Sequence, residues 1–179
     1  MGPSVELARI IDGCKSGDAE SFAQVVDRYS GRLYGYFYRL TGDRSLSDEL
    51  LSELYMKLVE KIKTYKGGSF ESWLFRIASN IFHDYLRGRK RHKKLVESKR
   101  GELEFATPQP KVSDGKDEKL DKLQIQLARL DADTKELIML RFYSDLSFKE
   151  IAEIRSEPIG TTLSKLHRGL KKLRELMEG

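Results

Sequence analysis

Residues 67–94, GGSFESWLFRIASNIFHDYLRGRKRHKK, combine a helical pattern with side chains that can bind nucleic acid. At about 100° per residue, one arc of this helix is polar. The arc holds Arg76, Asn80, His83, Asp84 and Arg87, with Trp73 at its edge. Amide, carboxylate and guanidinium groups beside an aromatic ring can stack on and read bases that are exposed in an unpaired strand. We therefore predict a face that binds single-stranded nucleic acid.

The opposite arc of the same helix is apolar and is predicted to be buried. It contains Phe70, Leu74, Ile77, Ala78, Ile81 and Tyr85. Trp73 lies on the boundary between the arcs, so a core aromatic and a stacking platform are both open interpretations. For Asp84 and Arg87 the alternative is an exposed ion pair within the helix, worth only about 0.2–0.5 kcal/mol.

Positive charge is concentrated in two clusters, although the net charge is only +5. Six of the eight residues in 87–94 are Lys or Arg, as are five of the ten in 165–174. Such clusters suit a polyanion, because each neutralised phosphate releases counterions. One cluster alone would fit a solvated helix face equally well, but two clusters that each follow a patterned helix favour nucleic acid. The predicted phosphate contacts of the first are Arg89, Lys90, Arg91, Lys93 and Lys94.

The C-terminal part has the pattern of a helix-turn-helix. Ser147 and Glu150 form a capping box that opens a short helix to about Ile154. Pro158 then occupies the first position of a last helix. Its apolar stripe of Ile159, Leu163, Leu166, Leu170, Leu173 and Met177 is predicted to be buried. The second helix of such a motif enters the major groove. We predict groove contacts from Thr161, Ser164, Lys165 and Arg168, and backbone contacts from Lys171 and Lys172.

The rest of the sequence predicts an all-α protein of two small helical domains joined by a flexible linker. Asp18 caps an early helix, and Ser45 with Asp48 is predicted to open another, which Gly67 and Gly68 end before Ser69 caps the next. Periodicity disappears after residue 97 among Gly, Pro and polar residues. The predicted parts are an N-terminal domain at 1–97, a linker at 98–117 and a helix-turn-helix domain at 118–179.

Composition excludes several classes of protein. No apolar run reaches the roughly 18 residues of a membrane span, and the N-terminus lacks the pattern of a secretory signal, so we expect a cytoplasmic protein with no membrane insertion. Cys14 is the single cysteine, which excludes an internal disulfide and a cysteine-cluster metal site, and it suits an apolar filler. The histidines lack ligand spacing, and there is no phosphate-binding glycine loop. We expect no metal, no cofactor and no enzymatic activity.

These motifs resemble a known family. SFESWLFRIASNIFHDYLRGRKR resembles the promoter-melting helix of bacterial extracytoplasmic-function (group IV) sigma factors. LARLDADTKELIMLRFYSDLSFKEIAEI and PIGTTLSKLHRGLKKLR are similar to their C-terminal helix-turn-helix domain, and GDAESFAQVVDRYSGRLYGYFYRLTGD fits their first helices. The resemblance implies a promoter-specificity subunit. Its first domain would bind core RNA polymerase and open the minus-ten element, and its second would read the minus-thirty-five element as duplex.

The resemblance also implies roles for individual residues. The helix at 46–62 matches the polymerase-binding surface, with Asp48, Glu49, Ser52 and Glu53 as its candidate contacts. Ser52 departs from the glutamine that is common there. The loop from Lys66 to Ser69 matches the loop that captures an extruded base. Trp73, Arg76, Asn80, Asp84 and Arg87 match the motif of the minus-ten helix.

The helix-turn-helix departs from the family pattern at two places. Arg155, Ser156 and Glu157 replace the usual Leu-Gly-apolar turn, so the glycine that suits a left-handed residue is missing. Leu163 stands where a basic residue is common. The motif is still expected to form, with a different set of residues facing the groove.

Two other classes remain as alternatives. A DNA-binding regulator with a sigma-like fold would not bind polymerase, and the Ser52 departure supports it. A nucleic-acid enzyme would need carboxylates that converge on metal ions, whereas the acidic residues here fall on caps and solvated faces. The resemblance further implies an anti-sigma protein as a partner, in addition to core RNA polymerase and promoter DNA.

Overall fold

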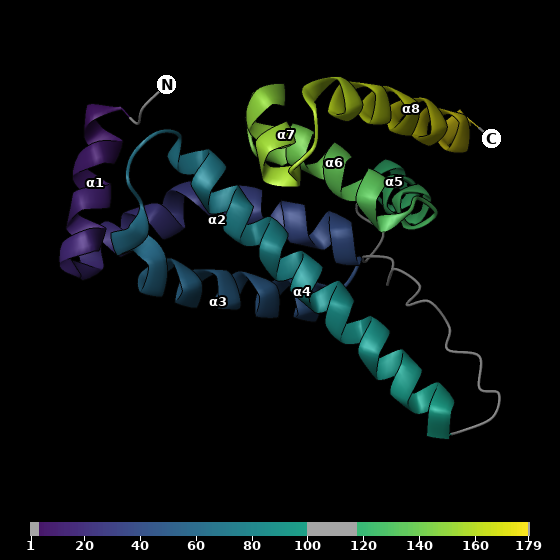
Figure 1. The fold of residues 1–179 in the computed structure, drawn as a ribbon, viewed down its shortest axis with the longest axis horizontal. Helices are drawn as coiled ribbons and strands as arrows, with labels where there is room; N and C mark the ends of the chain where they lie inside the picture. Colours follow the sequence, from purple (N-terminus) through teal and green to yellow (C-terminus); the bar gives the residue numbers. More distant parts are fainter. Residues whose placement is uncertain (1–3, 100–117, 179) are drawn as a thin grey trace.

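The computed structural model describes residues 4–99 and 118–178, and its elements there are all helical, which confirms the predicted all-α class (Figure 1). The elements are α1 (Val5–Ser16), α2 (Ala19–Thr41), α3 (Arg44–Lys61), the 3-10 turn η1 (Ile62–Thr64), α4 (Phe70–Lys99), α5 (Glu118–Ala128), α6 (Ala132–Tyr143), α7 (Phe148–Arg155) and α8 (Ile159–Glu178). Residues 98 and 99 belong to α4, whereas the remainder of the predicted linker lies outside the described residues.

Side-chain caps fix the starts of most helices, and one differs from the prediction. Asp18 Oδ2 accepts a hydrogen bond from the Ser21 amide at 2.9 Å, as expected. The cap of α3 is Asp43, not Ser45, because Asp43 Oδ1 accepts from the Leu46 amide at 3.1 Å. This start leaves Ser47 buried, where its hydroxyl lies 2.9 Å from the Thr41 hydroxyl.

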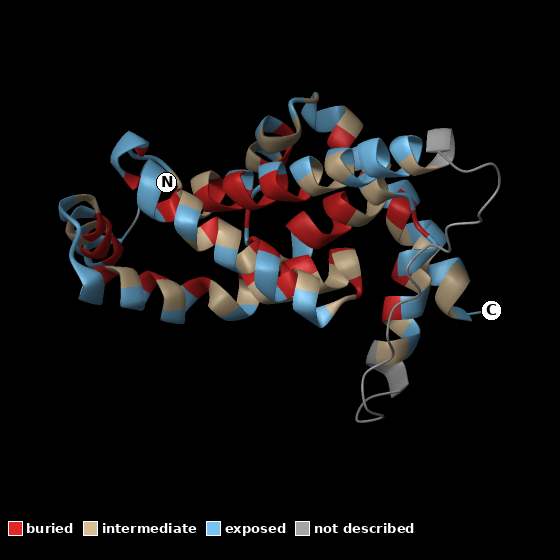
Figure 2. Cartoon of the chain, turned by 90° about the horizontal axis from the view of Figure 1, so that it is seen from below, coloured by how far each residue is buried: buried red, intermediate tan, exposed pale blue. Residues whose placement is uncertain are grey.

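Helices α1 to α4 enclose an aromatic core. Tyr29, Tyr36, Phe37, Phe70 and Phe75 are among its largest fully buried side chains. All of the predicted apolar arc of α4 is buried except Tyr85, which is half-buried. Phe75 and Phe82, which lie outside that arc, are buried as well. Figure 2 shows buried residues along the inward sides of the packed helices. Helix α4 is therefore covered on two sides.

Helix α8 packs against α5, α6 and α7, and Leu137, Ile138 and Leu140 of α6 are buried. The predicted stripe of α8 is only partly correct. Ile159 and Leu163 are 48% and 43% exposed, whereas Thr162, Leu166 and Gly169 are buried. A Cβ at Gly169 would lie 2.7 Å from Thr134 Cγ2, so the close approach of α8 to α6 runs along this face and turns Ile159 and Leu163 outward.

The two groups of helices pack directly against each other. Helix α2 contacts α5 and α6, and α4 contacts α7, so one continuous core passes through both groups. Gly35 of α2 makes this approach possible, because a Cβ there would lie 2.4 Å from the ring of Tyr143 in α6. The sequence alone gave no sign of this packing.

Candidate nucleic-acid interface

The polar face of α4 is open to solvent over most of its length. Arg76, Asn80, Asp84 and Arg87 are exposed, while the residues on the other sides of the helix are buried. Asp84 forms an ion pair with Arg87 and lies 3.9 Å from Lys57 Nζ on α3. Asn80 and Arg76 therefore offer hydrogen-bonding groups to a ligand on a rigid helix, and Asp84 orients its neighbours.

Trp73 lies at the edge of this face in an aromatic cluster. Its ring centroid is 5.5 Å from that of Tyr65 and 5.6 Å from that of Phe70. The indole is half-buried, so packing and stacking on a base are both compatible with its position. The loop beside it is shaped by Gly67 and Gly68, which have φ values of 104° and 89°. Ser69 caps α4 as predicted, accepting from the Ser72 amide at 3.1 Å.

The first basic cluster continues α4 as a helix to Lys99. In Figure 1 this end of the helix extends beyond the other elements. The predicted phosphate contacts Arg89, Lys90, Arg91, Lys93 and Lys94 are all exposed. The guanidinium of Arg89 lies 5.8 Å from the centre of the Tyr85 ring. This arrangement places a column of positive charge directly after the polar face.

The turn before α8 forms without glycine. Ser156 adopts the left-handed conformation at φ 53°, and its amide donates to the carbonyls of Ala152 and Glu153. Pro158 lies immediately before the helix, and its carbonyl accepts from the Thr162 amide at 3.0 Å. The helix-turn-helix is thus present, and Ser156 carries a backbone strain that the usual glycine would not.

The predicted groove residues of α8 differ in solvent exposure and in their ion pairs. Ser164, Arg168, Lys171 and Lys172 are exposed and Thr161 is half-buried. Lys165 instead donates to Glu157 Oε2 at 2.6 Å and lies 3.5 Å from Asp133. The hydrogen bond to Glu157 raises the pKa of Lys165. The Lys165 ammonium is therefore paired with carboxylates of the protein, and it must leave them to contact a phosphate or a base.

The candidate polymerase surface lies on α3, where Asp48, Glu49 and Ser52 are exposed and Glu53 pairs with Lys57 at 2.8 Å. Two apolar residues that the sequence reasoning missed continue this stripe. Met56 is 61% exposed and Val59 is 57% exposed. Their spacing from Ser52, of four and seven residues, is the helical signal that would have found them.

The most unexpected group is Glu136, a residue of α6 that is fully buried. Its Oε1 accepts from the Tyr36 hydroxyl at 3.2 Å and from the Ser79 hydroxyl at 2.6 Å. Its Oε2 lies 3.0 Å from His83 Nε2 and accepts from Arg155 at 3.1 Å. The carboxylate thus joins α2 and α4 to α6 and α7. Burial, and then the neighbouring Glu136, raise the pKa of Tyr36 well above its ordinary value.

Arg155, noted above as a departure in the turn, is the cation of this network. Its side chain is only 5% exposed and also pairs with Asp133 and with Glu157, the latter at 2.9 Å. Glu157 in turn accepts from the Thr162 hydroxyl at 3.0 Å and from Lys165. Arg155 and Glu157, the two charged residues of the turn, therefore pair with each other, and Arg155 also pairs with the buried carboxylate of Glu136.

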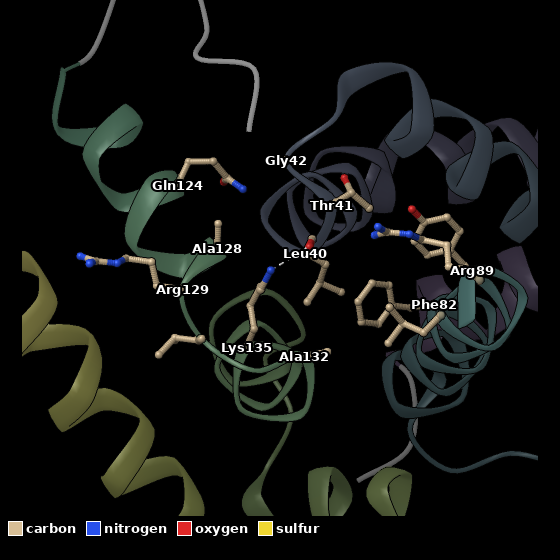
Figure 3. A pocket seen from close by; sticks show the side chains of 13 residues that line it. Leu40, Thr41, Gly42, Phe82, Arg89, Gln124, Ala128, Arg129, Ala132 and Lys135 are labelled. Carbon is tan, nitrogen blue, oxygen red and sulfur yellow. Dashed lines mark hydrogen bonds between the residues drawn. The ribbon is translucent and has the colours of Figure 1, made fainter. Parts of the chain in front are cut away.

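A pocket of about 330 Å³ lies where α2, α4, α5 and α6 meet (Figure 3). Lys135 reaches across it to donate to the Leu40 carbonyl at 3.2 Å, and Gln124 donates to the carbonyls of Tyr38 and Arg39 at 3.4 and 3.3 Å. Both residues thereby satisfy the C-terminal carbonyls of α2. Burial, and then the nearby Arg89, lower the pKa of Lys135.

Within residues 4–99 and 118–178, no group of three or more His, Cys, Asp or Glu side chains could hold a metal ion. Cys14 is buried, and this burial, followed by the nearby Asp18, raises the pKa of its thiol to about 11. A thiol in that state is a packing group at neutral pH.

None of the helices in the described ranges combines the length and the apolar character needed to cross a membrane.

The fold and both candidate interfaces agree with two protein families that occur together in sigma factors. The sigma-70 region 2 family matches residues 25–92, and the sigma-70 region 4 family matches residues 126–175. These matches contain the polar face of α4 and the helix-turn-helix.

Similar proteins narrow the class. The chain is 29% identical to the ECF RNA polymerase sigma factor SigW of Bacillus subtilis, covering 94% of this chain and 95% of that one. It is also 29% identical to the RNA polymerase sigma factor CarQ of Myxococcus xanthus, covering 91% and 92%. The chain belongs to the extracytoplasmic-function sigma factors, which confirms the resemblance.

Solved structures agree with this assignment. The chain is 27% identical to the sigma factor RpoE of Bartonella quintana, solved in complex with the anti-sigma factor NepR, with a TM-score of 0.69 over 89% of this chain and 98% of that one. CnrH, solved with the cytosolic domain of CnrY, is 18% identical with a TM-score of 0.66, over 94% of this chain and 95% of that one. The likeness to CnrH concerns the fold alone.

Proposed function

We propose that this chain binds core RNA polymerase in the cytoplasm of a bacterium, directs it to promoter DNA and opens that DNA to begin transcription. The observation that carries the proposal is the face of α4. Arg76 and Asn80 are exposed beside a half-buried tryptophan on a helix whose other sides are buried. A surface of this chemistry suits unpaired bases, and duplex-binding proteins have no need of it.

The proposed division of labour follows the two groups of helices, with boundaries near residues 97 and 118. Helix α4 and the loop before it would bind the opened minus-ten strand, with the basic end of α4 on phosphates. Extruding a base costs a few kcal/mol, which a preformed stacking face helps to offset. Helix α8 would read the minus-thirty-five element as duplex through Ser164 and Arg168, and the stripe of Asp48, Glu49, Ser52, Met56 and Val59 on α3 would bind polymerase.

An anti-sigma protein is the proposed regulatory partner. The sigma factor RpoE, to which the chain is similar, was solved in complex with an anti-sigma factor. A chain that exposes both DNA-binding helices and the α3 stripe would need such a partner, or a closed state of its own, to stay silent.

A DNA-binding regulator that does not act with polymerase is the second candidate. It is favoured only by Ser52, whose hydroxyl donates back to the Asp48 carbonyl at 2.8 Å and so offers less to a partner than a long amide would. The exposed Met56 and Val59 count against it, because a repressor has no use for an apolar stripe on this side of α3.

The test is runoff transcription with bacterial core RNA polymerase on a pool of promoter fragments. Asn80→Ala is expected to impair strand opening, Arg168→Ala to impair duplex binding, and the matched exposed change Asp12→Ala to do neither. If core polymerase is neither bound nor directed to any start site while duplex DNA is bound, the regulator takes the place of the sigma subunit.

A further inference from the structure

The pocket where α2, α4, α5 and α6 meet is lined by positive charge without negative charge beside it. Figure 3 shows Arg89 of α4 and Lys135 of α6 both pointing toward the C-terminal end of α2, whereas Arg129 points away from it. Among the described residues that line the pocket, none is Asp or Glu. Two cations therefore converge on one space with no carboxylate lining it.

These two cations lack the partners that the buried Arg155 has. The Lys135 ammonium donates to the neutral Leu40 carbonyl at 3.2 Å, and the Arg89 guanidinium lies 5.8 Å from the centre of the Tyr85 ring. Neither forms an ion pair with a residue in the described part of the chain, whereas Arg155 pairs with three carboxylates. Burial, and then the positive charge of Arg89, lower the pKa of Lys135. An anion between the two groups would relieve their repulsion.

The remaining wall of the pocket is mainly apolar. Leu40, Leu86 and Leu130 contribute to it, together with the rings of Phe82 and Tyr85. The two ring planes are inclined by only 28°, with their centroids 6.5 Å apart. Small-molecule sites typically combine such a lining with a few polar groups in roughly 300–1,000 Å³. At about 330 Å³, this pocket has room for a ligand with one flat ring system.

The neutral polar groups of the pocket are already engaged within the protein. The Gln124 amide donates to the carbonyls of Tyr38 and Arg39, and its oxygen accepts from the Arg39 guanidinium at 3.1 Å. The Thr41 hydroxyl donates to the Phe37 carbonyl at 2.9 Å. Recognition of an anion therefore falls to the two cations.

We propose that this pocket binds a small phosphorylated aromatic compound, with its phosphate between Arg89 and Lys135 and its ring against the apolar wall. A phosphate monoester carries about −1.5 to −2 charges at neutral pH, which matches the two cations, whereas one carboxylate would neutralise only one of them. Arginine binds phosphate through a planar pair of donors, and lysine adds a point charge. The site lies apart from the polar face of α4 and from α8, and it does not depend on the proposed function.

The DNA backbone is another source of phosphate, because Arg89 also belongs to the basic cluster of α4. Lys135 and Arg91 separate the two sources. Lys135 is half-buried and lines the pocket, whereas Arg91 is exposed on α4 and does not line it. A ligand in the pocket depends on Lys135, and a DNA strand along α4 depends on Arg91.

The experiment is isothermal titration calorimetry on the full-length protein with phenyl phosphate as the probe. Phenol supplies the ring without the charge, and inorganic phosphate supplies the charge without the ring. Because both parts of the pocket contribute, phenyl phosphate is expected to bind at least about tenfold more tightly than either. Equal affinity for phenyl phosphate and inorganic phosphate would overturn the proposal, and so would the absence of binding.

Matched variants locate the binding. Arg89→Gln and Lys135→Gln should each weaken phenyl phosphate about tenfold, because each removes a charge-assisted hydrogen bond. Glutamine at 135 keeps a donor for the Leu40 carbonyl, so the end of α2 stays satisfied. The control Arg91→Gln should stay within about twofold of the parent. Ala128→Leu fills the pocket without removing a charge and should weaken binding about fivefold or more, which tests the site even where a charge variant does not fold.

A single-stranded oligonucleotide titrated into the same proteins distinguishes the sources of phosphate. Its affinity should fall in Arg91→Gln and stay unchanged in Lys135→Gln, the reverse of phenyl phosphate. If Lys135→Gln weakens the oligonucleotide as much as phenyl phosphate, the cations of the pocket serve DNA and the proposal fails. If phenyl phosphate binds as expected but polymerase uses no promoter, the site stands and the proposed function fails.

Discussion

The two DNA-binding helices of this protein differ in how they are prepared. On α4 the candidate residues Arg76, Asn80, Asp84 and Arg87 are exposed on a helix that is buried on its other sides, whereas His83 contacts Glu136 of α6. On α8 the candidate Lys165 is already paired, and the turn that positions the helix contains a left-handed serine and two interacting charges. The polar face of the first helix is accessible to a ligand, whereas the second helix is part of the network that joins the two groups of helices.

The largest effect is expected from removing the cation of that network. Arg155→Ala leaves Glu136 buried without its arginine, although the hydrogen bonds from Tyr36 and Ser79 remain. Breaking a buried ion pair in this way costs about 3–5 kcal/mol. The free energy of unfolding, measured by urea denaturation, should fall by an amount in that range. Arg174→Ala, an exposed change on α8, should alter it by less than about 0.5 kcal/mol. Equal losses in the two variants would show that the network of Glu136 and Arg155 does not hold α8 in place.

A second prediction separates phosphate contacts on α8 from base contacts on α4. Lys171→Ala should weaken duplex binding evenly across sequences and reduce the slope of log affinity against log salt by about one. Asn80→Ala should leave that slope unchanged while it weakens binding to a single strand of the preferred sequence by about 1–3 kcal/mol. Titrations at several salt concentrations measure both. A reduced slope for Asn80→Ala would remove the distinction between the helices.

The local chemistry of both helices could be predicted from the sequence, because caps, periodicity and charge are encoded by near neighbours. Ser69, Ser147 and the buried arc of α4 show this. The contacts between the two groups could not be predicted. Glu136 looks like one more acidic residue on a helix, and only the fold brings Tyr36 and Ser79 to it from 100 and 57 residues away.

The error in the predicted buried stripe of α8 has a related cause. Leucines at three and four residue spacing predicted a stripe through Ile159 and Leu163, but Gly169 and Thr162 allow α8 to approach α6 on a different face. Small residues that permit close packing carry no apolar signal. The turn residues Arg155 and Glu157 were likewise visible only as departures from a family pattern, and their pairing required the structure.

A third prediction concerns the strain in the turn before α8. Ser156 holds a left-handed conformation that glycine adopts without penalty, so Ser156→Gly should raise the free energy of unfolding by up to about 1 kcal/mol. Ser164→Gly, inside α8, should lower it by about 0.5–1 kcal/mol. Thermal unfolding of the two variants gives opposite shifts. A loss for Ser156→Gly would mean that the serine side chain contributes more than its backbone costs.

The smallest effect is expected from pH, and it acts on His83, the α4 residue that contacts Glu136 of α6. The hydrogen bond to Glu136 raises the pKa of His83 against the opposing influence of burial, while Glu136 attracts and Arg155 and Arg87 repel its charge. A raised pKa in the folded protein means that protonation of His83 stabilises the fold. This contribution is fully present below the unfolded pKa of about 6.5 and is lost as pH rises through the raised value.

The free energy of unfolding, measured by urea denaturation, should therefore decrease slightly between about pH 6 and pH 8.5. His83→Gln keeps a hydrogen-bond donor for Glu136 but cannot titrate, so its free energy of unfolding should decrease less across this range. If the parent and His83→Gln respond to pH alike, another group controls the response, and His83 belongs with Asn80 among the residues available to DNA. A larger decrease in the parent would show that the His83 imidazole helps to join α4 to α6.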